Sequence, residues 1–214
     1  LVVPPTIARD QTGEVTLTVP EKGVNVFYTL DGTVPTVSSI PYSGPFRQVT
    51  PAVIQAVAQD PATGDVSEVS RAELDVAPAR WRVLTEDEKA QQVIDGRADS
   101  WWACPEGGPQ ELVIDLGETL DLRGFTYLPM QARWISGFIR NYECLTSLDN
   151  NTWTAAAEGE FGNILNSPIW QRVNFDARPA RYLKLKSTAT VDGQPPSFAE
   201  IGVLTVPSAP AIEN

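Results

Sequence analysis

The stretch over residues 93–117, VIDGRADSWWACPEGGPQELVIDLG, constrains the fold more than any other part of the chain. Within Glu111–Gly117 the apolar side chains alternate with other residues and share one face: Leu112, Ile114 and Leu116. This period-2 pattern, stopped by a glycine, is typical of a half-buried strand. Trp101 and Trp102 are adjacent, so in an extended chain they point to opposite sides. We therefore expect one tryptophan in a core and the other facing solvent or a ligand.

Length, charge and hydropathy limit the class of protein. The 214 residues suit two domains of about 70 and about 130 residues. Eighteen prolines and fifteen glycines without a period fit short strands joined by turns. A net charge of −11 and a pI near 4.4 argue against binding to nucleic acid or anionic membranes. The sequence has no long apolar run, which predicts no membrane insertion.

The scarcity of histidine and cysteine excludes several chemistries. The chain has no histidine, which rules out Ser-His-Asp and Cys-His catalysis and histidine-ligated zinc. Two cysteines cannot form a four-thiolate zinc site. The strand spacing of Cys144 predicts an apolar core residue, and a Cys104–Cys144 disulfide stays open as the alternative. The 27 acidic residues leave a carboxylate-pair glycosidase open.

The N-terminal part shows alternating strands around an Asp-Gly hairpin turn at Asp31. Its motifs are FYTLDGTVPT over residues 27–36, Tyr42-x-Gly44-Pro45-Phe46 and Ile54-x-Ala56-x-Ala58. This set resembles the C-terminal domain of chitobiases and β-hexosaminidases. The resemblance implies an immunoglobulin-like spacer domain over residues 1–77. We interpret its motif residues as turn chemistry and packing rather than as ligand contacts.

A second set of motifs covers roughly residues 80–205: Ile94-Asp95-Gly96, Ser100-x-Trp102, Leu112-x-Ile114-Asp115-Leu116-Gly117, Gly124-Phe125-x-Tyr127-x-Pro129, Gly137-x-Ile139-x-x-Tyr142, Ser147-x-Asp149-x-x-x-Trp153, Ala180-Arg181-Tyr182-Leu183-x-Leu185 and Ala199-Glu200-Ile201. It resembles the discoidin-like (coagulation factor 5/8 type C) domains, which include the family 32 carbohydrate-binding modules. The resemblance implies an eight-stranded jelly-roll sandwich over 78–207, followed by a tail at 208–214. We therefore expect an all-β chain of two sandwiches.

Loops of the second domain supply the candidate glycan site. Sugar recognition needs an apolar platform together with planar hydrogen-bonding groups. The loops Trp101–Gln110, Met130–Gly137 and Gly159–Gln171 offer both kinds of side chain. We select the following residues as candidates: Trp134, Arg133, Gln131, Trp101, Phe161 and Asn163. The alternative for Trp134 is that it plugs the end of the sandwich or packs on a neighbouring domain.

The sequence departs from its sugar-binding relatives at three positions. The relatives often have a histidine, an arginine and an asparagine where this chain has Ala103, Met130 and Ser136. We therefore expect the galactose-type site of the relatives to be absent. Any glycan bound here would be held by other residues.

The resemblance also implies a structural calcium site. Its positions match Gln92, Asp95, Ser100, Ala199 and Glu200. A position that usually offers a ligand oxygen holds an arginine, Arg97, whose guanidinium cannot ligate a cation. Two alternatives follow: calcium binds with one ligand fewer, or the Arg97 side chain neutralises the two carboxylates.

Together these features predict a non-catalytic accessory region of a secreted, periplasmic or cell-surface bacterial glycoside hydrolase. An α-L-fucosidase-like or β-hexosaminidase-like parent is expected, with its catalytic domain upstream of Leu1 and weak glycan binding by the second sandwich. The alternative is a purely architectural pair of modules that supports a catalytic domain or its oligomer. A glycosidase within this chain is disfavoured, because neither resemblance supplies a carboxylate pair.

Overall fold

The computed structural model describes residues 2–134 and 136–206, and the expected tail at 208–214 lies outside them. The chain divides into two compact units, Leu1–Ala79 and Arg80–Asn214. Both units are built from antiparallel sheets. The all-β prediction, an immunoglobulin-like sandwich followed by a discoidin-like jelly roll, is confirmed. No helix within the described residues is long and apolar enough to cross a membrane.

The first unit packs two sheets around a small core. One sheet has the order β1-β2-β5 and the other β4-β3-β6-β7. The strands are β1 (Thr6–Arg9), β2 (Glu14–Thr18), β3 (Asn25–Thr29), β4 (Ile40–Pro41), β5 (Phe46–Arg47), β6 (Ala52–Gln59) and β7 (Ser70–Leu74). Their alternating residues are buried as the sequence pattern predicts, for example Val15 and Leu17 on β2.

The motif residues of the first unit form a turn and an aromatic cluster. Asp31 Oδ1 accepts hydrogen bonds from the backbone N–H and the hydroxyl of Thr33, at 3.1 and 2.6 Å. Gly32 has φ +78°, a conformation that favours glycine, between Asp31 and Thr33. The ring of Tyr28 stacks on Phe46 with centroids 4.6 Å apart. These contacts stabilise the fold, in line with the interpretation made from the sequence.

The second unit is a sandwich whose main sheet has the order β12-β11-β13-β10-β15, with β8 also paired to β10. A separate two-stranded sheet joins β9 to β14. The elements are β8 (Arg82–Val83), η1 (Glu88–Ile94), β9 (Trp102–Ala103), β10 (Glu111–Leu128), β11 (Ile139–Ser147), β12 (Thr154–Glu160), β13 (Gln171–Thr190), β14 (Ser197–Phe198) and β15 (Glu200–Leu204).

The two longest strands, β10 and β13, each join segments that the sequence pattern separates. The predicted strand over Glu111–Gly117 continues through a bend, because the ladder to β13 breaks between Asp115 and Leu120 and then resumes. Gly117 has φ +76°, and a Cβ at that position would lie 2.7 Å from the carbonyl oxygen of Arg80. The glycine therefore bends the strand rather than ending it.

The short 3-10 helix η1 was not predicted from the sequence. Asp87 caps it by accepting a hydrogen bond from the N–H of Lys89, and Ala90, Val93 and Ile94 bury its inner side. The helix leads directly into the loop that carries Asp95. It therefore fixes the start of the acidic loop described below.

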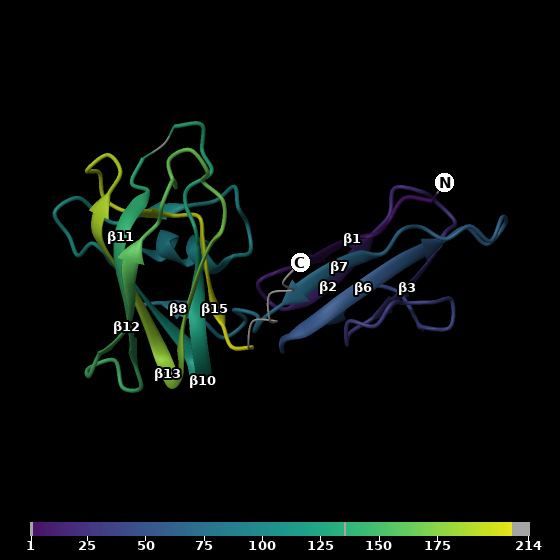
Figure 1. Cartoon of the computed structure of the whole chain (residues 1–214), viewed down its shortest axis with the longest axis horizontal. Helices are drawn as coiled ribbons and strands as arrows, with labels where there is room; N and C mark the ends of the chain where they lie inside the picture. Colours follow the sequence, from purple (N-terminus) through teal and green to yellow (C-terminus); the bar gives the residue numbers. More distant parts are fainter. Residues whose placement is uncertain (1, 135, 207–214) are drawn as a thin grey trace, which may run out of the picture. The chain divides into compact units, whose positions relative to one another are not determined.

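The core of the second unit is rich in aromatic rings, and loops lie at both ends of the sandwich (Figure 1). Stacked and edge-on rings of Phe125, Tyr127, Tyr142 and Phe161 fill it. In the view of Figure 1 the loops before β11 and before β13 lie at the upper end of the sandwich. The hairpin between β11 and β12 lies at the opposite end.

Candidate functional site

Two loops leave the sheet side by side at the upper end of the second sandwich. Tyr127 on β10 pairs with Gln171 at the first residue of β13. The segment 129–134 therefore follows β10 next to the point where the segment 161–170 enters β13 (Figure 1). Strand pairing thus brings together two of the loops that were chosen from the sequence as candidate glycan-binding loops.

Trp134 is the most exposed large apolar side chain of these loops, at 77%. The guanidinium of Arg133 lies 5.7 Å from the centroid of its ring, within the range of a cation–π contact. At this exposure most of the indole surface stays accessible. Within its own unit Trp134 does not pack into the core, so the indole can act as a platform.

Gln131 has a different role from the one predicted. Its Nε2 donates hydrogen bonds to the carbonyl oxygens of Pro129 and Pro168, both at 2.8 Å. An amide nitrogen carries two hydrogens, so both donors of Gln131 are used. Gln131 therefore holds the two loops together, and only its carbonyl oxygen could accept a hydrogen bond from a sugar hydroxyl.

Phe161 does not belong to a surface site, whereas Asn163 lies in a turn at the surface. Phe161 is 5% exposed and stacks on Tyr127 and Tyr142 in the core, so its selection as a sugar contact is wrong. Asn163 adopts φ +58°, and its Oδ1 accepts a hydrogen bond from Nδ2 of Asn166 at 2.8 Å. Asn163 is exposed, but it shapes the turn.

The paired tryptophans separate as the alternation predicts. Trp102 is 5% exposed, and its Nε1 donates a hydrogen bond to Asp87 at 2.8 Å. Trp101 is 44% exposed and remains accessible to a ligand. The alternation predicted that the two indole rings point in opposite directions, but it did not predict which ring is buried.

Structural roles are observed for the three residues that replace polar residues of the relatives. Met130 is 3% exposed and belongs to the core. Ser136 offers its carbonyl oxygen to the hydroxyl of Ser197 at 2.6 Å. Ala103 pairs with Ser197 in the sheet of β9 and β14. These positions therefore provide apolar side chains and backbone contacts in place of a histidine, an arginine and an asparagine.

Two exposed apolar residues that follow Pro168 were not among the glycan-site candidates chosen from the sequence. Ile169 is 64% exposed and Trp170 is 50% exposed, directly before β13. An Ile-Trp pair between a proline and a strand was the available signal. It was not decisive, because the same pair could equally have turned into the core.

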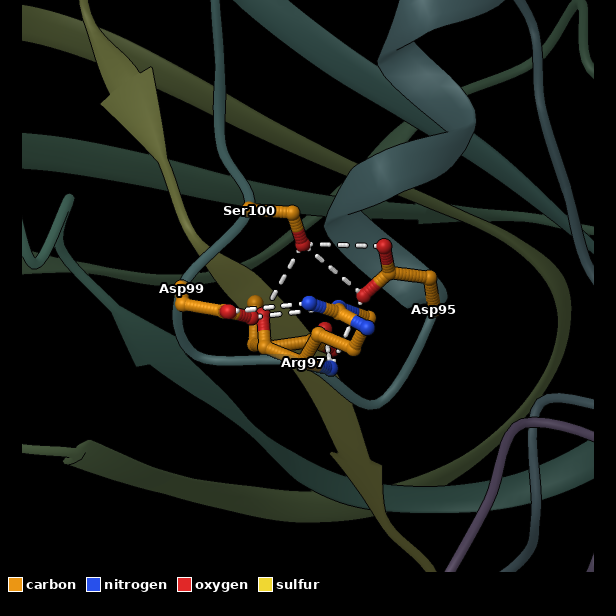
Figure 2. A network of polar contacts seen from close by, with 5 residues as sticks. Asp95, Arg97, Asp99 and Ser100 are labelled. Atoms are coloured by element: carbon orange, nitrogen blue, oxygen red, sulfur yellow. Dashed lines mark hydrogen bonds and ion pairs between the residues drawn. The ribbon is translucent and has the colours of Figure 1, made fainter.

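A second cluster of polar residues lies in the loop after η1. Figure 2 shows Ser100 facing Asp95, with the hydroxyl 3.0 and 2.9 Å from the two carboxylate oxygens. The backbone N–H of Arg97 donates to both Asp95 and Glu200, at 2.8 Å each. Glu200 is the first residue of β15 and is 7% exposed. The turn thus brings two carboxylates together.

The Arg97 side chain does not neutralise this pair. Its Nε and Nη2 instead donate to the carboxylate of Asp99, at 3.1 and 2.8 Å, as Figure 2 shows. Both of these side chains are largely exposed. The alternative in which the Arg97 guanidinium replaces a cation between Asp95 and Glu200 is therefore wrong, because the turn directs it away from them.

The electrostatics of Glu200 match a site that lacks a counter-charge. Burial, followed by the neighbouring carboxylate of Asp95, raises the pKa of Glu200 to about 8. Among residues 2–134 and 136–206, no basic side chain forms an ion pair with either carboxylate. Two carboxylates and the Ser100 hydroxyl are hard oxygen donors of the kind that Ca²⁺ prefers. These residues therefore fit a calcium ion.

The carboxylates alone do not make a complete metal site. Within the described residues, no three acidic, cysteine or histidine side chains gather around one point. A cation held by Asp95 and Glu200 would need further oxygens from Ser100 and from the backbone carbonyls of Gln92 and Ala199. The Gln92 carbonyl already accepts a long hydrogen bond from the N–H of Asp95, at 3.4 Å.

The two cysteines are free and buried. Burial raises the pKa of each thiol to about 12, so neither is a thiolate at neutral pH. Cys144 lies in the core, as its strand spacing predicts, and the alternative disulfide is not formed.

Family comparisons agree with this architecture. The F5/8 type C domain model matches residues 77–201, and the chain belongs to this family. The chitobiase/β-hexosaminidase C-terminal domain model matches residues 6–71. Both resemblances drawn from the sequence motifs are thus confirmed.

Among curated proteins, a galactose oxidase of Gibberella zeae is 30% identical over 127 residues, which cover 56% of this chain. The match spans only 18% of that relative's length. Among solved structures, the module CpGH89CBM32-5 of Clostridium perfringens, in complex with GalNAc-β-1,3-galactose, is 27% identical with a TM-score of 0.51. It covers 58% of this chain and 93% of its own.

The C-terminal domain of a chitobiase from Bacteroides fragilis has a TM-score of 0.52 at 18% identity, covering 61% of this chain and 97% of its own. At this identity the likeness concerns the fold alone.

Proposed function

We propose that this chain is a non-catalytic accessory region of a secreted bacterial glycoside hydrolase, and that its second sandwich binds glycans weakly. Both matched families are accessory types of module, and a structural neighbour of the second unit was solved with a disaccharide. An α-L-fucosidase-like or β-hexosaminidase-like parent, with its catalytic domain outside this chain, is the finer part of the proposal. The chain itself is expected to hydrolyse no aryl fucosides, galactosides or N-acetylglucosaminides.

The observation that carries the proposal is the exposed indole of Trp134 backed by Arg133. A pyranose could stack on the exposed ring, while the guanidinium supplies hydrogen-bond donors to its hydroxyls. Few other polar side chains converge there, since Met130 is buried and the Gln131 donors are occupied. We therefore expect millimolar affinity, about 4 kcal/mol, with little selectivity between sugar epimers.

Calorimetric titration of the chain with galactose, N-acetylgalactosamine and N-acetylglucosamine tests this function. Trp134→Ala should abolish binding and change the free energy of unfolding by less than about 1 kcal/mol, because an exposed ring leaves no cavity. Leu148→Ala is the matched control, since Leu148 is 57% exposed at the opposite end of the sandwich. Unaltered binding by Trp134→Ala would overturn this site, and the architectural alternative would be preferred if no glycan bound.

The second part of the proposal is a structural calcium ion near the acidic loop. Asp95, Ser100 and Glu200 would hold it through side-chain oxygens, and Gln92 and Ala199 through carbonyl oxygens. The ion would supply the positive charge that the two facing carboxylates lack, and it would fasten the loop after η1 to β15. Its role would be stability rather than chemistry.

A further inference from the structure

Hydrogen bonds of Gln131 join the two upper loops of the second sandwich, the one that follows β10 and the one that precedes β13. We call these hydrogen bonds the tie. The Gln131 amide reaches from the first loop to Pro168 in the second, and Nε2 of Gln171 donates to the carbonyl oxygen of Ile169 at 2.8 Å. Trp134 lies three residues from Gln131, and Trp170 lies two residues from Pro168. The reach of a chain keeps both tryptophans within roughly 10 Å of the tie.

The tied loops expose three large apolar side chains. Trp134, Ile169 and Trp170 are 77%, 64% and 50% exposed, and all three lie on the tied loops. Gathered exposed apolar side chains of this kind mark binding surfaces rather than ordinary solvent-facing positions. The net charge of −11 disfavours an anionic membrane as the occupant.

We propose that Ile169 and Trp170 form a second stacking platform beside Trp134, so that the ligand is an oligosaccharide that spans both indoles. This inference rests on the proposed glycan-binding function and adds the ligand class. Each indole alone offers weak stacking. A second sugar unit of the same chain then binds its platform as an intramolecular event, which raises affinity without any new polar contact.

The test is calorimetric titration of the whole chain with two series of increasing length. One series is galactose, β-1,4-galactobiose and β-1,4-galactotetraose; the other is N-acetylglucosamine with its β-1,4-linked dimer and tetramer. In the series that binds, the tetramer should bind at least about tenfold more tightly than the monomer. Trp170→Ala should remove this gain and leave the affinity for the monomer unchanged.

Leu148→Ala serves as the control and should keep the full gain with length. Melting curves confirm that each variant is folded. Equal affinity of the wild-type chain for monomer and tetramer would overturn the second platform while leaving the proposed function standing. Loss of monomer binding by Trp170→Ala would also overturn it, because Trp170 would then belong to the first platform.

A wild-type chain that binds no member of either series would instead overturn the proposed function together with this inference. Binding to vesicles of phosphatidylcholine and phosphatidylserine, lost in Trp170→Ala without any response to sugar, would assign the surface to a membrane.

Discussion

Two acidic sites of the second sandwich differ in whether the chain supplies their counter-charge. On β10, Asp115 accepts two hydrogen bonds from the guanidinium of Arg181, at 2.9 and 3.0 Å. These bonds hold the pKa of Asp115 below its usual value. In the acidic loop, Glu200 and Asp95 meet without an ion pair to any basic side chain of the described residues, and the pKa of Glu200 rises to about 8.

The comparison shows that an arginine near an acid in the sequence does not predict a pair. Arg97 is two residues from Asp95, yet its side chain turns to Asp99. Arg181 is 66 residues from Asp115, but Asp115 is paired in register with the neighbouring Tyr182. Strand register places Arg181 next to Asp115, whereas the turn geometry directs the Arg97 side chain away from Asp95.

The largest expected effect is that of calcium on the acidic loop. A ligand that binds only the folded state stabilises it by about 2.7 kcal/mol at 100 times its Kd. Chelation should therefore lower the melting temperature of the second unit, and added Ca²⁺ should restore it. The measurement is calorimetric melting with EGTA and with calcium.

Glu200→Gln keeps the shape of the side chain and removes its charge. In this variant the melting temperature should no longer respond to calcium, whereas Asp115→Asn should respond as the wild type does. If chelator leaves the wild-type melting curve unchanged, the two carboxylates hold no calcium and the calcium proposal fails.

The next effect is that of breaking the Asp115 pair. Asp115→Ala removes the partner of Arg181 and the acceptor of the Gly117 N–H, which lies 2.8 Å from Oδ1. A loss of about 1–2 kcal/mol in the free energy of unfolding is expected, measured by urea denaturation. Arg80→Ala, which removes an exposed arginine of the same unit, is the control and should change little.

The same pair predicts a dependence on pH. Because folding lowers the pKa of Asp115, its contribution is present above the unfolded-state pKa and is lost as the pH falls through the folded-state value. Asp115→Asn should therefore lower stability at pH 7 and converge with the wild type in strong acid. A constant difference between the two proteins down to acidic pH would contradict an ionic role for Asp115.

The smallest expected effect is that of Arg97. Its guanidinium forms an ion pair with Asp99 (Figure 2), and both side chains are exposed. Arg97→Ala should change the free energy of unfolding by less than about 0.5 kcal/mol, with or without calcium, because the N–H that binds the carboxylates is retained. A loss of about 3 kcal/mol would restore the view that its guanidinium neutralises Asp95 and Glu200.

Local patterns were sufficient for the buried faces of several strands and for the families. The alternation of Leu112, Ile114 and Leu116 predicted their buried face, and all three are at most 2% exposed. The Asp31-Gly32 turn followed from residue types alone, since few residues besides glycine adopt positive φ without strain. Such features depend on neighbours in the chain, and the sequence displays them directly.

The sites depended on contacts between distant segments, which only the tertiary structure decided. Gln131 ties a loop 37 residues away, and Glu200 meets a loop about 100 residues before it. Phe161 entered the core, while Trp170, from the same predicted loop, remained half exposed. An aromatic side chain in a loop can be accommodated either in the core or at the surface. Strand register and turn geometry, rather than residue type, determined whether it packs in the core or faces a ligand.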